Sequence, residues 1–111
     1  MAGGMTDIPE EIYQMILDNL HKTYTLDEST EKRIRNETAS GIAYIRKYCD
    51  PGADCLPGTR FGQMLCDYVL RAEAEALETF PRDFAEEITA SRIEYETAKY
   101  AEAMGYAETK E

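Results

Sequence analysis

The longest run of regularly spaced apolar residues lies between Thr59 and Phe80 and predicts a long central helix. Apolar side chains recur there every three or four residues, which places them on one face of an α-helix. They are Phe61, Met64, Leu65, Tyr68, Val69, Ala72, Ala76 and Phe80. Thr59 is suited to cap the first turn, because its hydroxyl can accept a hydrogen bond from an unpaired backbone N–H. Leu70, Ala74 and Leu77 form a second apolar row on the opposite side. We therefore expect this helix to be sandwiched between other elements or between its domain and a partner.

Two further helices are predicted before the central one. The first begins near Asp7, where a capping residue is followed by Pro9 and two glutamates, and it ends near His21. Its apolar stripe consists of Ile12, Tyr13, Ile16, Leu17 and Leu20.

The second predicted helix begins after Asp27, which can cap its first turn. One side of it carries Ile34, Thr38, Gly41, Ile42, Ile45 and Cys49. Gly41 on this apolar face lowers helix propensity by about 1 kcal/mol relative to Ala. It either permits the close approach of a neighbouring helix or is a tolerated weak point.

Residues 50–58 contain two prolines and two glycines, which predicts a loop before the central helix. Pro81 predicts a kink or a break after that helix, since it has no backbone N–H. A last helix is expected from about Arg82 to Tyr100. It has two apolar rows, namely Phe84, Ile88, Tyr95 and Ala98 on one side and Ile93, Tyr100 and Met104 on the other.

These patterns predict an all-α fold, a small bundle of about four helices with a long central helix and a C-terminal helix. Gly105 is a suitable C-terminal stop for the last helix. We expect a flexible N-terminus over residues 1–6, one helical domain over 7–104 and a disordered tail over 105–111.

Composition then limits the classes of function. The chain of 111 residues has 22 acidic and 12 basic side chains, a formal charge of −10. A chain of this length is expected to form one domain. Its charge repels phosphate backbones, which makes direct binding to nucleic acid improbable. We also expect no membrane span and no signal peptide, because the chain has neither a long apolar run nor a basic leader followed by an apolar segment.

The side chains that usually carry chemistry form no convincing site. His21 is the only histidine; Asp18 lies one helical turn before it, but no second cluster supplies further metal ligands. Pairs of carboxylates one turn apart are frequent, as expected by coincidence in so acidic a chain, and there is no glycine-rich phosphate loop. We expect no enzymatic activity, no metal and no cofactor.

The three cysteines, Cys49, Cys55 and Cys66, are odd in number, which favours reduced thiols in a cytoplasm over a disulfide framework. Cys49 and Cys66 lie on apolar helix faces and are expected to be buried. Cys55 lies in the loop and is expected to be exposed and open to oxidation. The pattern assigns no role to any of the three.

From the second helix onward the sequence resembles the small head–tail connector (adaptor, head-completion) proteins of long-tailed bacteriophages and prophages. The resemblance is carried by LDESTEKRIRNETASGIAYIRKYC, a Gly/Pro loop, and then GTRFGQMLCDYVLRAEAEALETFPRDFAEEITASRIEYE. The positions that fit the family's pattern in the second stretch are Leu65, Asp67, Tyr68, Ala76, Leu77, Glu78, Phe80, Phe84, Ile88, Glu94 and Tyr95. With the preceding helix, the resemblance covers about residues 7–96.

The resemblance implies a virion protein of the head–tail interface, made in the cytoplasm of the bacterial host. Such proteins form a ring of about a dozen subunits beneath the portal. The ring extends the DNA channel, through which DNA passes without specific binding, and it docks the next connector, stopper or tail protein. Opposed apolar stripes agree with this, because they can supply both a core and subunit contacts.

If this function holds, we expect the contact with a neighbouring subunit or the portal to include residues of the last two helices. They are Leu70, Leu77, Phe80, Arg82, Phe84, Ile88, Arg92 and Tyr95. We also expect Arg71, Arg82 and Arg92 to pair with carboxylates of the neighbour; otherwise they are ordinary surface arginines. Ring formation can require the portal as a template.

One alternative from another class is a small acidic helical regulator of a prophage, such as a DNA mimic that occupies a basic site. A mimic needs carboxylates along one face at phosphate-like spacing, whereas a ring protein needs opposed apolar patches. The sequence favours the ring protein. An enzyme built on carboxylates carried by helices would instead bind a divalent metal tightly.

Overall fold

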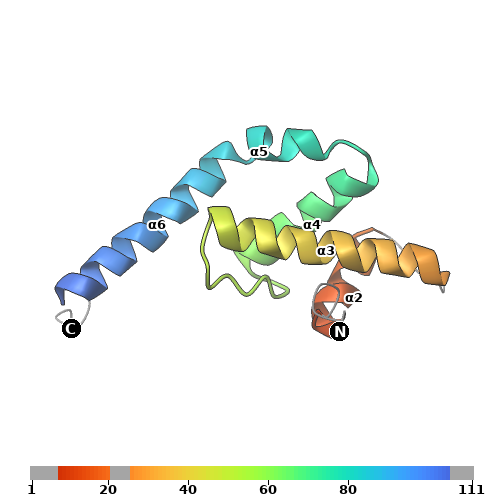
Figure 1. Cartoon of the computed structure of the whole chain (residues 1–111), viewed down its shortest axis with the longest axis horizontal. Coiled ribbons are helices and arrows are strands. Elements are labelled where there is room, and N and C mark those ends of the chain that lie inside the picture. Colours follow the sequence, from red (N-terminus) through yellow and green to blue (C-terminus); the bar gives the residue numbers. More distant parts are fainter. Residues whose placement is uncertain (1–7, 21–25, 106–111) are drawn as a thin grey trace.

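The computed structural model describes residues 8–20 and 26–105, and over these residues the chain forms helices and no strands. The elements in order are α2 (Glu10–Asn19), α3 (Glu28–Tyr48), α4 (Arg60–Glu73), the 3-10 helix η1 (Leu77–Thr79), α5 (Phe80–Asp83) and α6 (Ala85–Met104). Figure 1 shows α3 beside α4, with α2 crossing below and α6 leaving the body at one end. The predicted all-α bundle is confirmed.

The core lies where α2, α3 and α4 meet. Ile16, Ile34, Ile45, Leu65 and Val69 are completely buried there and come from all three helices. Burial of such side chains contributes about 1.5–3 kcal/mol each, which makes this cluster the main source of stability. The apolar stripes predicted for these segments are therefore the faces that meet.

Gly41 marks the closest approach of α3 to α4. A Cβ atom built at this position would lie 2.6 Å from Cδ1 of Leu65 and 2.8 Å from Cδ1 of Tyr68. Both neighbouring side chains are buried. The first of the two interpretations of Gly41 is thus confirmed: the missing side chain lets α4 pack against α3.

Three of the predicted helix boundaries are confirmed by capping contacts. The carboxylate of Asp27 accepts a hydrogen bond from the backbone N–H of Thr30 at 2.8 Å, and the hydroxyl of Thr59 accepts from that of Gly62 at 3.0 Å. Gly105 ends α6 in the left-handed conformation, with φ +80°. The cap expected at Asp7 and the helix end expected at His21 lie outside the described residues.

The central helix is shorter than predicted, because α4 ends at Glu73 instead of continuing to Phe80. Glu75 takes the left-handed conformation, with φ +58°, and Ala76 donates its N–H to the carbonyl of Arg71 at 2.8 Å. This closure resembles a Schellman motif with Glu where Gly is usual, at a cost of about 1–2 kcal/mol. The reversal turns Phe80 back into the core, where it is fully buried, and that burial outweighs the strain.

Two further expectations about this part of the chain need correction. The last helix begins at Ala85, three residues after the predicted start, and it continues four residues past Tyr100 to Met104, directly before the predicted stop at Gly105. Cys55 is completely buried, although it lies in the predicted loop, because residues 50–58 fold back against the body. Nε of Arg46 holds this loop by donating to the carbonyl of Ala53 at 2.9 Å.

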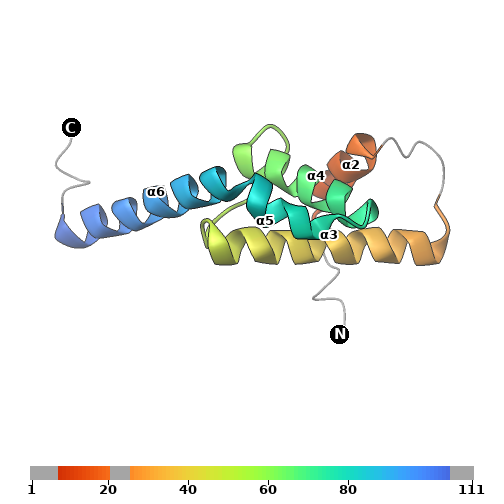
Figure 2. The ribbon, with the colours of Figure 1, turned by 90° about the horizontal axis from the view of Figure 1, so that it is seen from above.

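The molecule is elongated. Its extents are 53 × 30 × 25 Å and its radius of gyration is 16.0 Å. A compact domain of this length would have a radius of gyration of about 13 Å. Figure 2, viewed at right angles to Figure 1, again shows α6 extending away from the other helices.

Candidate functional site

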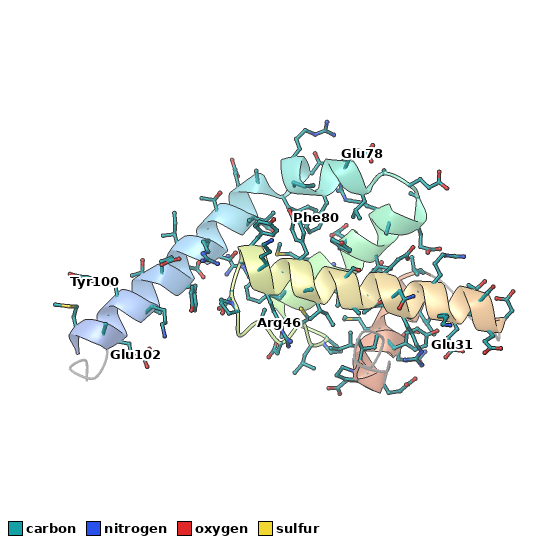
Figure 3. All side chains as sticks on the ribbon, in the orientation of Figure 1. Glu31, Arg46, Glu78, Phe80, Tyr100 and Glu102 are labelled. Carbon is teal, nitrogen blue, oxygen red and sulfur yellow. The ribbon has the colours of Figure 1, made fainter. Side chains whose placement is uncertain are left out.

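The corner between α5 and α6 is set by a cluster of aromatic rings. Phe80 packs edge-on against Tyr44 and Tyr68, with ring centroids 5.6 and 5.3 Å away, and stacks on Phe84 at 4.6 Å. Figure 3 shows Phe80 directed inward from α5 toward α3. These contacts fix the direction in which α6 leaves the body.

An ion pair closes the same corner on its outer side. Nη1 of Arg71 donates to Oδ2 of Asp83 at 2.6 Å and to the hydroxyl of Thr79 at 2.7 Å. These bonds tie the end of α4 to η1 and α5. The hydrogen bond from Arg71, together with one from Arg82, lowers the pKa of the Asp83 carboxyl.

The first half of α6 is anchored on the body. Ile88 packs against the core, and Ser91 is buried and donates to the carbonyl of Ile88 at 3.0 Å. Arg92 donates to the carbonyl of Lys47 at the end of α3 at 3.2 Å. Glu94 pairs with Arg60 at the start of α4 at 2.9 Å. α6 is thus held at a defined angle.

The outer side of α6 carries a stripe of uncharged residues along most of its length. We call this the α6 stripe; it consists of Thr89, Ile93, Thr97, Tyr100 and Met104, which recur every three or four residues. Ile93 and Met104 are large apolar side chains with 58% and 51% of their surface exposed. In Figure 3, Tyr100 lies on the part of α6 that stands away from the other helices. A helix of this kind presents a surface suited to association.

The residues predicted for a subunit interface fall into two groups. Leu70 and Arg82 are exposed, and Arg92 and Tyr95 are half-buried on α6. The other four belong to the core or pack against it, namely Leu77, Phe80, Phe84 and Ile88. Phe80 is completely buried and offers no surface to a partner.

The three arginines that were expected to pair with a neighbour each have a carboxylate partner within the chain. Arg71 and Arg82 both contact Asp83, at 2.6 and 3.2 Å, and Arg92 contacts Glu96 at 3.0 Å. Contact with a neighbouring subunit remains a prediction.

Sequence reasoning missed a pair of carboxyl groups between α3 and α4. Arg33 of α3 forms a bidentate pair with Glu73 of α4, at 3.0 and 2.8 Å. Glu37 lies one turn further along α3 beside Glu73, and its Oε1 atom is buried without a hydrogen-bond partner among the described residues. Burial raises the pKa of Glu37 to about 8, and the Glu73 carboxylate beside it adds to this effect. Glu37 is therefore largely protonated at neutral pH.

A signal for this pair was present in the sequence. Glu37 is three residues after Ile34 and four before Gly41, so that it falls within the apolar stripe of its helix. A carboxyl group at such a position must be paired or protonated.

Beside these groups an open groove of about 450 Å³ lies between α3, the end of α4 and η1. We call it the α3–α4 groove. Its lining includes polar side chains of α3 and apolar ones of α4 and η1: Ser29, Lys32, Arg33, Asn36, Glu37, Ser40, Tyr68, Ala72 and Leu77.

The other groups with possible chemistry are arranged differently. All three cysteines are buried, and burial raises the pKa of Cys55 to about 11, which makes it a poor nucleophile. Over residues 8–20 and 26–105, no three His, Cys, Asp or Glu side chains are grouped to hold a metal ion. His21 lies outside these ranges. No helix in the same ranges is both long and apolar enough to cross a membrane.

The chain was compared with protein-family models, curated proteins and solved structures. None of the three comparisons yields a match. Any functional conclusion therefore depends on the geometry above and on the resemblance in the sequence.

Proposed function

We propose that the protein is a structural head–tail connector of a bacteriophage or prophage. In this proposal it assembles as a ring beneath the portal, lengthens the DNA channel and docks the next connector, stopper or tail protein. The observation that carries the proposal is α6, a helix of 20 residues that projects from the body with an uncharged, partly apolar stripe on its outer side.

The shape of the subunit supports a ring. A ring repeats one contact between two different surfaces of the same chain, and such a head-to-tail contact closes when the rotation between copies divides the circle evenly. An elongated subunit with α6 at one end offers unlike surfaces at its two ends (Figures 1 and 2). The resemblance over residues 7–96 points to the same kind of assembly.

The charge of the chain supports the second part of the proposal. A subunit with a net charge of −10 repels the phosphate backbone. A channel lined by such subunits lets DNA slide without holding it, whereas a basic lining would bind it.

The alternative of a DNA mimic receives less support. Several carboxylates that a basic partner would have to reach are paired with arginines of the same chain, namely those of Glu31, Glu73, Asp83 and Glu94. A mimic also has no use for an exposed apolar stripe on a projecting helix.

The solution mass tests the proposal. Light scattering is measured over a concentration series of the purified protein, alone and with the portal protein of the phage or prophage that encodes it. We expect a species of about ten or more subunits, alone or on the portal. A monomer or dimer that does not bind the portal would contradict the proposal and favour the acidic regulator. Mass spectrometry of released phage particles gives an independent measurement, since a connector must be present in them.

The stripe itself is tested by Ile93→Gln. This change removes apolar surface from the centre of the stripe while keeping a helix-forming side chain. We expect it to reduce the amount of ring, whereas the control Lys99→Gln, on the same exposed part of α6 but off the stripe, should leave it unchanged. Equal effects of both changes would show that the stripe is not the contact.

A further inference from the structure

The charges of the subunit are distributed unevenly between α6 and α3. α6 carries five carboxylates and two cations: Glu86, Glu87, Glu94, Glu96 and Glu102 against Arg92 and Lys99. α3 carries five cations and three carboxylates: Lys32, Arg33, Arg35, Arg46 and Lys47 against Glu28, Glu31 and Glu37. It is the one helix in the described part of the chain with a net positive charge. The excess comes from Arg46 and Lys47 at its end beside α6, whereas its first half carries Lys32, Arg33 and Arg35 together with the three glutamates.

The α3–α4 groove combines two cations with an apolar floor. Lys32 and Arg33 come from the first half of α3, while Ala72 of α4 and Leu77 of η1 contribute apolar atoms. A groove between helices with a charged edge and an apolar floor suits an amphipathic helix.

The groove and the α6 stripe lie at opposite ends of the molecule. The first half of α3, which lines the groove, is at the end away from α6 in both views (Figures 1 and 2). Within one copy the stripe cannot reach its own groove, but in a second copy placed along the long axis it can.

We propose that the projecting half of α6 of one copy docks in the α3–α4 groove of a second copy. The stripe residues Ile93 and Met104 then face the apolar floor. The carboxylate of Glu96, beside the stripe, exchanges its exposed pair with Arg92 for one with Lys32. The choice of a second copy as the occupant rests on the proposed function, because a ring repeats one contact between copies. The proposal goes further by naming both surfaces.

Two properties of the groove favour an acidic helix as the occupant. Arg33 already neutralises Glu73 through a bidentate pair. The remaining carboxyl group facing the groove, Glu37, is held mostly uncharged by burial and by Glu73, while Tyr68 and Arg33 are the other titratable groups beside it. The groove therefore presents the cation of Lys32 without an opposing free carboxylate from Glu37.

The size of the contact predicts its strength. A stable pairwise interface buries about 800 Å² on each partner, and one half of a helix in a shallow groove buries less. The contact is expected to be weak between two free copies. In a closed ring every copy docks its α6 on one neighbour and binds the α6 of the other. The ring is therefore held by many copies of the same weak contact.

The experiment is photo-crosslinking with a benzophenone amino acid in place of Met104. Protein of natural isotope content is mixed with uniformly ¹⁵N-labelled protein at millimolar concentration, and again on the portal, so that links between copies are distinguished by mass. We expect mixed-isotope links from position 104 to residues 29–40 or to Leu77. The same probe at Glu87, exposed on α6 but off the stripe, should give no such links.

A charge exchange makes the test specific. Lys32→Glu and Glu96→Lys should each reduce the yield of these links about fivefold, and the double variant should restore most of the yield. Circular dichroism checks that each variant folds. Links that map to another α6 or to α2, links within one copy only, no links between copies, or no recovery in the double variant would each overturn the proposal.

The two proposals fail in different ways. A ring on the portal whose crosslinks do not involve the groove would leave the connector function standing and remove this interface. The predicted crosslinks without any ring on the portal would establish the contact between copies and contradict the connector function.

Discussion

Stability should decrease as pH rises through the neutral range, and one side chain should be responsible. Glu37 is held between α3 and α4, with Glu73 beside it and Arg33 within 4.0 Å. Its pKa is raised from the usual 4.5 to about 8, mainly by burial. Between these two values the folded protein keeps a proton that the unfolded chain has released.

The sign follows from proton counting. The free energy of unfolding changes with pH in proportion to the protons bound by the unfolded state minus those bound by the folded state. For Glu37 this difference is negative between pH 4.5 and 8. The free energy of unfolding is therefore highest at low pH, where Glu37 is protonated in the folded protein, and it falls as pH rises.

The magnitude follows from the size of the shift. A shift from 4.5 to about 8 corresponds at most to about 5 kcal/mol, at about 1.4 kcal/mol per pH unit. The Glu37 side chain keeps 20% of its surface exposed, and both solvent and Arg33 reduce the cost of its charge. We therefore expect a loss of about 2 kcal/mol between pH 5 and pH 8.

Urea denaturation followed by circular dichroism at pH 5, 6, 7 and 8 measures this change. The comparison is made in a His21→Gln background, since histidine also titrates in this range. Glu37→Gln should be equally stable at all four values, because its amide cannot ionise. The exposed carboxylate of Glu78 provides the matched control, and Glu78→Gln should keep the pH dependence. A flat profile for the parent, or the same slope in Glu37→Gln, would refute this account of the carboxyl pair.

Three further changes test the packing. Gly41→Ala should destabilise the protein by about 1 kcal/mol. Overpacking against Leu65 and Tyr68 costs about 1–3 kcal/mol, which exceeds the gain in helix propensity of about 1 kcal/mol. A variant that is more stable in urea denaturation would contradict the close packing. Phe80→Ala should lower the free energy of unfolding by about 3–5 kcal/mol and speed the hydrogen exchange of the amides of α6. Unchanged exchange would mean that the aromatic cluster does not set the angle of α6. Glu75→Gly should stabilise by about 0.5–1 kcal/mol in thermal unfolding, since glycine adopts the left-handed conformation without strain, and a lower melting temperature would argue against that strain.

Much of the fold was predictable because its signals are local. The caps at Asp27 and Thr59 need only a side-chain oxygen beside the first unpaired N–H groups of a helix, and both are in place. The apolar stripes needed only their spacing. For Gly41 the sequence left two interpretations, a point of close approach or a tolerated weak point, and its contacts with Leu65 and Tyr68 of α4 decide for the first.

The parts that could not be predicted depend on contacts between distant segments. Residues 71–79 favour a helix by propensity, and only the burial of Phe80 against Tyr44 and Tyr68 makes a break after Glu73 worthwhile. Cys55 is buried because its loop folds back on the body, which no local pattern indicates.

The direction of α6 is a further property of the tertiary structure. The sequence showed two apolar rows on this helix, but not which of them faces the body. Ile88 and Ser91 turned out to be anchored, whereas Ile93 and Met104 are exposed. The candidate site therefore lies on the row of Ile93, Tyr100 and Met104, from which the sequence analysis predicted no interface residue.

The high negative charge and the proposed assembly are compatible for a reason of length scale. The repulsion between two copies with a charge of −10 each acts over the distance between their centres, and at physiological ionic strength charges are screened beyond about 8 Å. In the proposed contact, the attraction between a carboxylate of α6 and a cation of α3 of the next copy acts across about 4 Å, within that limit. Salt at cellular concentration thus removes more of the repulsion than of the attraction. An acidic subunit can in this way join its neighbours through one oppositely charged contact while the rest of its surface still repels DNA.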